Sequence, residues 1–133
     1  MSTTDKGWAD YWQHDGDGGE VFVNAKGERH PALAEYWRLV FSRLPANARV
    51  MDLASGAGSI FAHLESDHGQ QLHAADIAAE ALQALEQRIP NVATTVCSAS
   101  AVPLDDGSFD LVVSQFGIEY AGFAAFTEAA RLL

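Results

Sequence analysis

The order of apolar and polar residues predicts an alternation of helices and strands over most of the chain. Between residues 31 and 44, apolar side chains recur at three- and four-residue spacing, which places them on one face of a helix. Pro31 suits the first position of that helix, and Pro45 ends it. Further helical patterns cover 59–66, 78–89 and 122–133, and short apolar or β-branched runs predict strands at 49–54, 71–75, 92–97 and 109–114.

Strands that alternate with helices predict an α/β fold with a parallel sheet, since parallel neighbours need a crossover helix. The continuous apolar run at 111–113 agrees, because parallel strands are covered on both faces. We expect an N-terminal aromatic and glycine-rich segment over residues 1–30 and the α/β domain over residues 31–133. The aromatic residues of the first segment are candidates for a lid: Trp8, Tyr11 and Trp12.

Composition narrows the class of protein. The 133 residues include 18 Asp and Glu against 8 Lys and Arg, which gives a net charge of −10. Such a surface repels phosphates, so we expect neither nucleic acid nor an anionic membrane as the partner. With 48% hydrophobic residues the chain can bury a core, which excludes wholesale disorder. A single cysteine and the lack of an apolar run of ~18 residues favour a cytoplasmic protein without a membrane span.

The strongest candidate for chemistry is the glycine-rich turn between the first predicted strand and the next helix, Asp52-Leu53-Ala54-Ser55-Gly56-Ala57-Gly58. Glycine lets the backbone turn tightly and approach a ligand closely, and a helix N-terminus offers unpaired N–H groups. Ligands of open α/β sheets bind beyond the carboxyl ends of the strands. The turn therefore predicts a nucleotide-like cofactor at residues 54–59.

Residues around the turn distinguish the candidate cofactors. The turn lacks the lysine of a phosphate-binding P-loop, and Phe61 stands where the dinucleotide fingerprint needs a small residue. A nicotinamide cofactor is therefore the weaker alternative. Asp52 would oppose a pyrophosphate but suits a ligand with a positive centre or an ammonium group. Asp76 follows Gly58 at close to the ~20-residue spacing of an acid that binds ribose hydroxyls; its other interpretation is a cap of the following helix.

Three motifs in this order resemble the class I S-adenosylmethionine-dependent methyltransferases. They are the glycine turn, Asp76-Ile77, and the segment Val102-Pro103-Leu104-Asp105-Asp106-Gly107-Ser108-Phe109-Asp110-Leu111-Val112-Val113-Ser114. The match covers residues 48–133. The resemblance implies a Rossmann-like three-layer sandwich with strand order 3-2-1-4, S-adenosyl-L-methionine as the cofactor, and methyl transfer by in-line displacement.

The resemblance also implies which residues contact the cofactor. The turn would hold its amino-acid part, Asp76 its ribose, and Ile77 with the residues after the third strand its adenine. Together with Asp52, the implied contacts are Ala54, Ser55, Gly56, Ala57, Gly58, Asp76, Ile77, Ser98, Ala99, Ser114, Gln115 and Phe116. Two positions depart from the family pattern. Ala54 replaces the first glycine of the turn, which fits if its φ is negative, and Ser98 stands where an acid is common.

We name no catalytic residue, because methyl transfer from a sulfonium mainly requires an aligned nucleophile and the exclusion of water. The negative charge of the chain favours a small-molecule methyl acceptor. The alternative is a cofactor-binding or assembly module of the same fold with impaired catalysis. The five histidines and Cys97 form no metal-ligand pattern, so we expect no metal.

The family fold continues beyond the fourth strand with further strands, whereas this sequence ends at Leu133 inside a predicted helix. We therefore expect a truncated domain that lacks the C-terminal strands of the family fold. Its fourth strand, 109–114, would then be an apolar edge, and we expect homo-oligomers that form through it.

Overall fold

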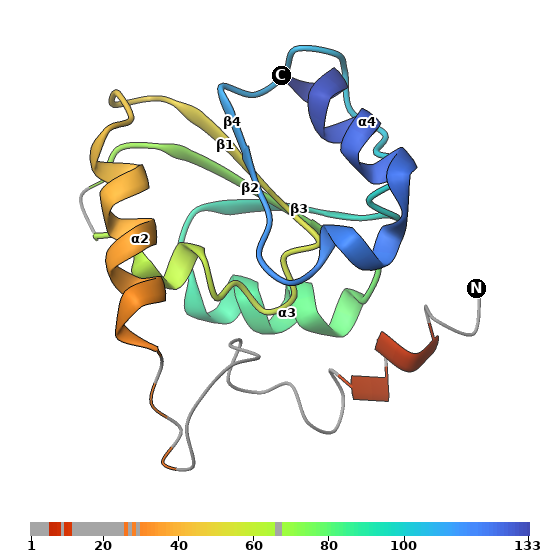
Figure 1. The fold of residues 1–133 in the computed structure, drawn as a ribbon, viewed down its shortest axis with the longest axis horizontal. Helices are drawn as coiled ribbons and strands as arrows, with labels where there is room; N and C mark the ends of the chain where they lie inside the picture. The colour runs from red at the N-terminus through yellow and green to blue at the C-terminus, as the bar shows by residue number, and fades with distance from the viewer. Residues whose placement is uncertain (1–5, 9, 12–25, 27, 29, 66–67) are drawn as a thin grey trace.

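The computed structural model describes residues 6–8, 10–11, 26, 28, 30–65 and 68–133 (Figure 1). Residues 6–8 and 10–11 are helical, and Trp12 lies outside the described residues. The labelled elements follow in chain order: α2 (Pro31–Ser42), β1 (Arg49–Leu53), η1 (Phe61–His63), β2 (Gln71–Asp76), α3 (Ala79–Arg88), β3 (Val92–Val96), β4 (Leu111–Val113), η2 (Ile118–Ala121) and α4 (Phe123–Leu132).

The strands form one parallel sheet in the order β3-β2-β1-β4, which confirms the predicted topology. Asp52 in β1 lies opposite Ala74 in β2 and opposite Val113 in β4. Asp76 at the end of β2 lies opposite Val96 in β3. This register brings the carboxyl ends of neighbouring strands together. We call the residues that follow them the carboxyl edge: 54–58, 76–78, 97–99 and 114–117.

Helices cover both faces of the sheet, so the predicted three-layer sandwich is confirmed (Figure 1). On one face, α2, η1 and α3 pack against alternate strand residues. The buried residues there are Trp37, Phe41, Val50, Ile60, Phe61, Leu72, Ala74, Leu82, Leu85 and Val113. On the other face, α4 packs through Ala125 and Leu132 against Met51, Leu53 and Ala75. Burial of these apolar side chains is the main source of stability.

The segment after the glycine turn differs from the prediction. We expected a helix over 59–66, but residues 59–60 form a turn and only the short 3₁₀ helix η1 follows, at 61–63. The physical reason is burial on every side: Ser59, Ile60 and Phe61 are consecutive, and each is at most 7% exposed. An amphipathic helix would turn some of these neighbours toward solvent. Leu64 then takes an extended conformation and ends η1.

The other elements match the expected types, with small changes at their ends. The largest change is in β4, which covers 111–113 instead of 109–114. Phe109 donates its N–H to Leu132 O in α4, and Asp110 donates its N–H to Arg49 O. The backbone of these two residues thus anchors the entry to β4. β4 pairs only with β1 among the described residues, so it lies at an edge of the sheet, as expected.

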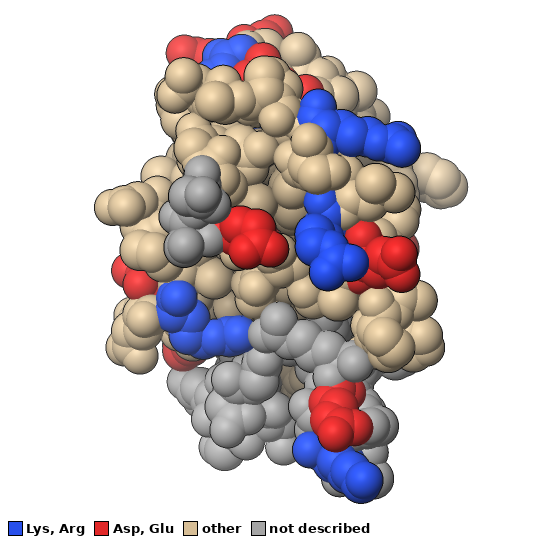
Figure 2. All heavy atoms as spheres, turned by 90° about the vertical axis from the view of Figure 1, so that its left-hand side faces the viewer, with Lys and Arg blue, Asp and Glu red and all other residues tan. Residues whose placement is uncertain are grey.

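The face that includes α2 carries acidic and basic side chains side by side (Figure 2). Lys and Arg do not gather there into a continuous stripe, in keeping with the acidic composition of the chain. Across the described residues, no helix is both long and apolar enough to cross a bilayer.

Candidate functional site

The glycine turn after β1 packs tightly against the neighbouring layer. Gly56 and Gly58 have φ values of 55° and 89°, in the region that favours glycine. A Cβ at Gly58 would lie 2.9 Å from two side-chain carbons of Leu85, so only glycine lets the turn approach α3 this closely. Ser55 donates its N–H to Ala75 O at 3.1 Å, which fastens the turn to the end of β2.

Ala54 begins the turn in a strained conformation. Its φ is +58°, so the expectation that alanine fits with a negative φ is wrong. A left-handed conformation costs a residue with a Cβ about 1–2 kcal/mol. The backbone of Gly117 lies directly against Ala54, since a Cβ at Gly117 would be 2.7 Å from Ala54 O and 2.9 Å from Ala54 Cβ. The ends of β1 and β4 therefore touch at this point.

Asp76 is held by backbone N–H groups on both sides. Its Oδ2 accepts from Gly56 N and its Oδ1 from Ala78 N, each at 2.9 Å. Burial raises the pKa of Asp76, and these N–H groups partly oppose that rise. Each carboxylate oxygen can accept a second hydrogen bond, so two acceptor positions remain. Asp76 is therefore fixed where it can also bind a pair of hydroxyl groups.

Asp52 lies beside Asp76 in the sheet but has no such support. It is 1% exposed, and neither carboxylate oxygen accepts a hydrogen bond from the described residues. Burial raises the pKa of Asp52 well above its usual range, and the charge of Asp76 raises it further. An unpartnered buried carboxyl group is costly, and a cationic or hydrogen-bond-donating ligand would satisfy it.

The segment after β4 is anchored to α2 and to the segment that follows the glycine turn. Gln115 Oε1 accepts from Trp37 Nε1 in α2, and Gln115 Nε2 lies 3.5 Å from Ser59 Oγ in the turn segment. Ser114 Oγ accepts from Ile118 N at 3.2 Å. These bonds position Ser114, Gln115 and Phe116 at the carboxyl edge.

The residues after β3 complete the carboxyl edge. Cys97 donates its N–H to Asp76 O, which brings Ser98 beside Ile77. Ser98 Oγ bonds Ser100 Oγ at 2.8 Å. Ala99, at 7% exposed, belongs to the core cluster that α4 covers.

The structure thus brings the expected residues together, and two of them are buried apolar residues. Ala57 is fully buried, and Ala99 packs in the core, so their side chains support the site from behind. Sequence analysis missed Trp37, Ser59 and Gly117. Trp37 lies within the predicted helix 31–44, and its indole N–H was the signal that could have prompted a search for an acceptor, because a buried indole usually has one.

An aromatic contact brings the N-terminal helical residues to the same end of the molecule. The ring of Trp8 lies 5.5 Å from that of Tyr120 in η2, edge to face, and 5.9 Å from that of Tyr11. Because η2 directly follows the anchored segment after β4, Trp8 lies near the carboxyl edge.

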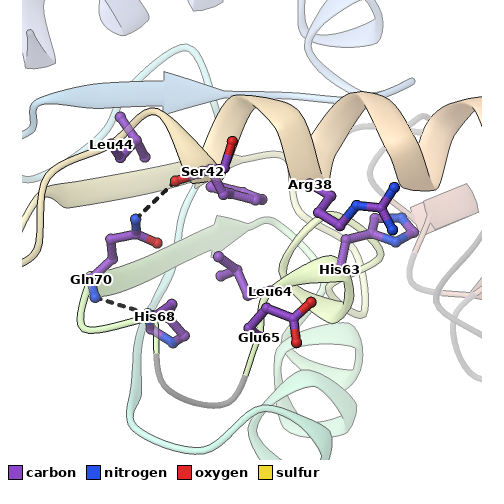
Figure 3. A pocket seen from close by; sticks show the side chains of 9 residues that line it. Arg38, Ser42, Leu44, His63, Leu64, Glu65, His68 and Gln70 are labelled. Carbon is purple, nitrogen blue, oxygen red and sulfur yellow. Dashed lines mark hydrogen bonds between the residues drawn. The ribbon is translucent and has the colours of Figure 1, made fainter.

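A separate cavity of about 260 Å³ lies between α2 and the connection from η1 to β2 (Figure 3). Arg38 and His63 lie close together on one side of it, and Gln70 bonds Phe41 O and His68 on the other (Figure 3). None of the expected cofactor contacts lines this cavity.

The chain matches the family model described as a methyltransferase domain over residues 50–133, and it therefore belongs to that family. An uncharacterized methyltransferase of Schizosaccharomyces pombe is 30% identical over 113 residues, which are 84% of this chain and 45% of the relative. The chain thus spans about half the length of that relative.

Solved structures share the fold. One is a chain of the complex between the Haloferax volcanii Trm112 methyltransferase activator and its methyltransferase partner, with a TM-score of 0.72 and 23% identity, over 95% of this chain and 55% of that one. Another is a SAM-dependent methyltransferase from Thiobacillus denitrificans in complex with S-adenosyl-L-homocysteine, with a TM-score of 0.63 and 23% identity, over 78% of this chain and 44% of that one.

Proposed function

We propose that the carboxyl edge binds S-adenosyl-L-methionine and that the protein transfers its methyl group to a small-molecule acceptor. The observation that carries the proposal is the pair of buried acids beside the glycine turn: Asp76, fixed by two backbone N–H groups, and Asp52, without a partner among the described residues. The family of the chain and the Thiobacillus denitrificans structure with S-adenosyl-L-homocysteine support it.

The chemistry of this donor set fits the cofactor. Asp76 keeps two acceptor positions for the ribose hydroxyls, and Ile77 and Ser98 lie next to it for the adenine. The unpartnered carboxyl of Asp52 suits the ammonium group of the methionine part. The glycine turn at 54–58 allows close approach of that part to the backbone.

When bound, the cofactor supplies a methyl group on a positively charged sulfur with a neutral leaving group. The protein then has to hold the acceptor in line and to keep water out. Gln115 fixes the segment after β4 to α2 and to Ser59, which keeps that side of the site rigid. We assign no general base.

We propose that the N-terminal segment, residues 1–30, acts as a lid over the domain formed by residues 31–133. The contact of Trp8 with Tyr120 supports this role, since it joins the segment to the carboxyl edge. The acidic composition favours a small acceptor without phosphates and a cytoplasmic protein. Self-association through the exposed edge of β4 stays a prediction that light scattering at high concentration can test.

Calorimetric titration of the purified chain with S-adenosyl-L-methionine tests the proposal. We expect saturable binding, and accumulation of S-adenosyl-L-homocysteine once a panel of small acceptors is added. No binding at millimolar cofactor would refute the proposal. Binding without turnover on any acceptor would favour the alternative, a cofactor-binding or assembly module, which the strained Ala54 also suits.

A further inference from the structure

The most strained aromatic residue of the described chain stands at the carboxyl edge. Phe116 has a φ of +55°, a left-handed conformation that is rare for a bulky residue. Its side chain is 38% exposed, so it does not belong to the buried core. Strained residues of this kind persist where the surroundings enforce them, and they cluster at ligand sites.

Both neighbours of Phe116 are fixed. Gln115 is bonded through its side chain to Trp37 and lies close to Ser59. Gly117 is pressed against Ala54, and any side chain at position 117 would collide with Ala54 O. Tyr120 donates its N–H to Gly117 O and closes the turn that follows. The backbone of Phe116 is therefore trapped between the glycine turn and η2.

This trap places the backbone of Phe116 beside Gly117, which touches the first residue of the turn, and the side chain of Phe116 is 38% exposed. Ala54, which touches Gly117, begins the segment that we assign to the methionine part of the cofactor. The reacting centre of that part is a sulfonium, and the face of an aromatic ring attracts cations. The carboxyls of Asp52 and Asp76 are buried, at 1% and 9% exposed, whereas Phe116 is 38% exposed, so its side chain is more accessible than theirs.

We propose that Phe116 is a specificity-determining residue, whose ring favours the positively charged sulfonium of S-adenosyl-L-methionine over the neutral thioether of the product. The inference rests on the proposed function and deepens it. Weaker binding of the neutral product would help its release and limit inhibition by it. The contacts of Gln115 and Gly117 hold the backbone of Phe116 in place.

The experiment compares the dissociation constants of three probes by calorimetry on the full chain: S-adenosyl-L-methionine, S-adenosyl-L-homocysteine, and sinefungin, which carries an amine in place of the sulfonium. Phe116→Leu keeps the strained backbone position and removes the ring. We expect it to lower the preference for the two cations over S-adenosyl-L-homocysteine by about 3- to 20-fold. Phe116→Tyr should keep the preference.

A matched control removes a ring elsewhere. Phe123 in α4 is 93% exposed, and Phe123→Leu should leave all three constants unchanged. Phe116→Gly tests the strain directly: it should lose the preference as Phe116→Leu does and yet unfold at a higher temperature than Phe116→Leu, because glycine adopts positive φ without penalty. Equal melting temperatures of Phe116→Gly and Phe116→Leu would contradict backbone strain at position 116.

The outcomes separate this inference from the proposed function. If the wild-type chain binds none of the three probes, the proposed function fails and this inference fails with it. If the wild-type chain binds them but Phe116→Leu keeps the ratio of the constants, cofactor binding stands and the role of Phe116 is refuted. Loss of the preference for both cations, with the Phe123→Leu ratio unchanged, supports the role.

Discussion

The carboxyl ends of β1 and β2 lie side by side and are built in opposite ways. At the end of β2, Asp76 is buried and receives hydrogen bonds from Gly56 N and Ala78 N. At the end of β1, Asp52 is buried still more deeply, and no described residue donates to it. The carboxyl group at the end of β2 thus has hydrogen-bond donors within the protein, and the carboxyl group in β1 has none among the described residues.

The difference between Asp52 and Asp76 shows how one site can keep an ordered structure and still bind a ligand. The acid that is satisfied by the backbone orders the glycine turn, since Gly56 belongs to that turn. The acid that is left unsatisfied costs folding free energy, which a bound cation can recover. The strained φ of Ala54 adds to the cost at the end of β1. We therefore assign order to the end of β2 and affinity for a cation to the end of β1.

The largest effect is expected at the end of β2. Asp76→Ala removes the acceptor of two buried N–H groups, so the free energy of unfolding should fall by about 1–3 kcal/mol. It also removes both acceptor positions for the ribose, and S-adenosyl-L-methionine should bind at least about 100-fold more weakly. Calorimetry and denaturant unfolding measure the two effects.

Asp110→Ala is the matched control, since Asp110 is an exposed carboxylate at the start of β4 that pairs with Arg49. It should leave cofactor binding unchanged. Binding of Asp76→Ala within a few-fold of wild type would remove Asp76 from the ribose site.

At the end of β1, the same type of change should separate stability from binding. Asp52→Asn removes a buried carboxyl without a partner and keeps the shape of the side chain, so the protein should unfold at a higher temperature at neutral pH. The ammonium group loses its anionic partner, and the cofactor should bind about tenfold more weakly. A destabilised variant with unchanged binding would show that Asp52 is a structural residue and not a cofactor contact.

The pH dependence of stability sharpens the contrast. Because burial and the charge of Asp76 raise the pKa of Asp52, the folded state holds this proton more firmly than the unfolded state. Its contribution to stability is fully present below the unfolded pKa near ~3.9 and is lost as the pH rises through the raised pKa. Glu128 acts in the opposite direction, since hydrogen bonds from Arg131 lower its pKa to about 2.

The difference in stability between wild type and Asp52→Asn isolates the contribution of Asp52 from that of Glu128. Urea unfolding from pH 4 to 8 should show that the advantage of the variant grows with pH. A difference that stays constant over this range would mean that Asp52 keeps the same protonation state in the folded and unfolded protein.

Local pattern predicted the strands well because their burial is periodic or continuous. The apolar runs that contain Val50, Leu72 and Val113 lie in β1, β2 and β4, and the crossover rule together with the family resemblance gave their order. The prediction of a helix at 59–66 was wrong because Ile60 and Phe61 are buried by residues of α2, α3 and the sheet, which lie far away in sequence.

The sequence predicted where the residues of the candidate site lie, but it did not predict the backbone strain at Ala54 and Phe116. Motif spacing placed Asp76 and the glycine turn correctly at the carboxyl edge. The positive φ values of Ala54 and Phe116 depend on contacts between residues far apart in sequence, such as Ala54 with Gly117 and Gln115 with Trp37. Neither contact has a signal in local composition.

The smallest effect is expected from Ala54 itself. Ala54→Gly relieves the left-handed strain, and the free energy of unfolding should rise by about 1 kcal/mol, partly offset by the freedom of glycine in the unfolded chain. Gly117→Ala should destabilise the protein through its clash with Ala54 O. Because that clash is with the backbone, the double variant should stay destabilised, and thermal unfolding of all three variants tests this order. If Ala54→Gly instead destabilised the protein, the methyl group would be supporting β4 through Gly117, and the end of β1 would be a structural contact rather than a strained one.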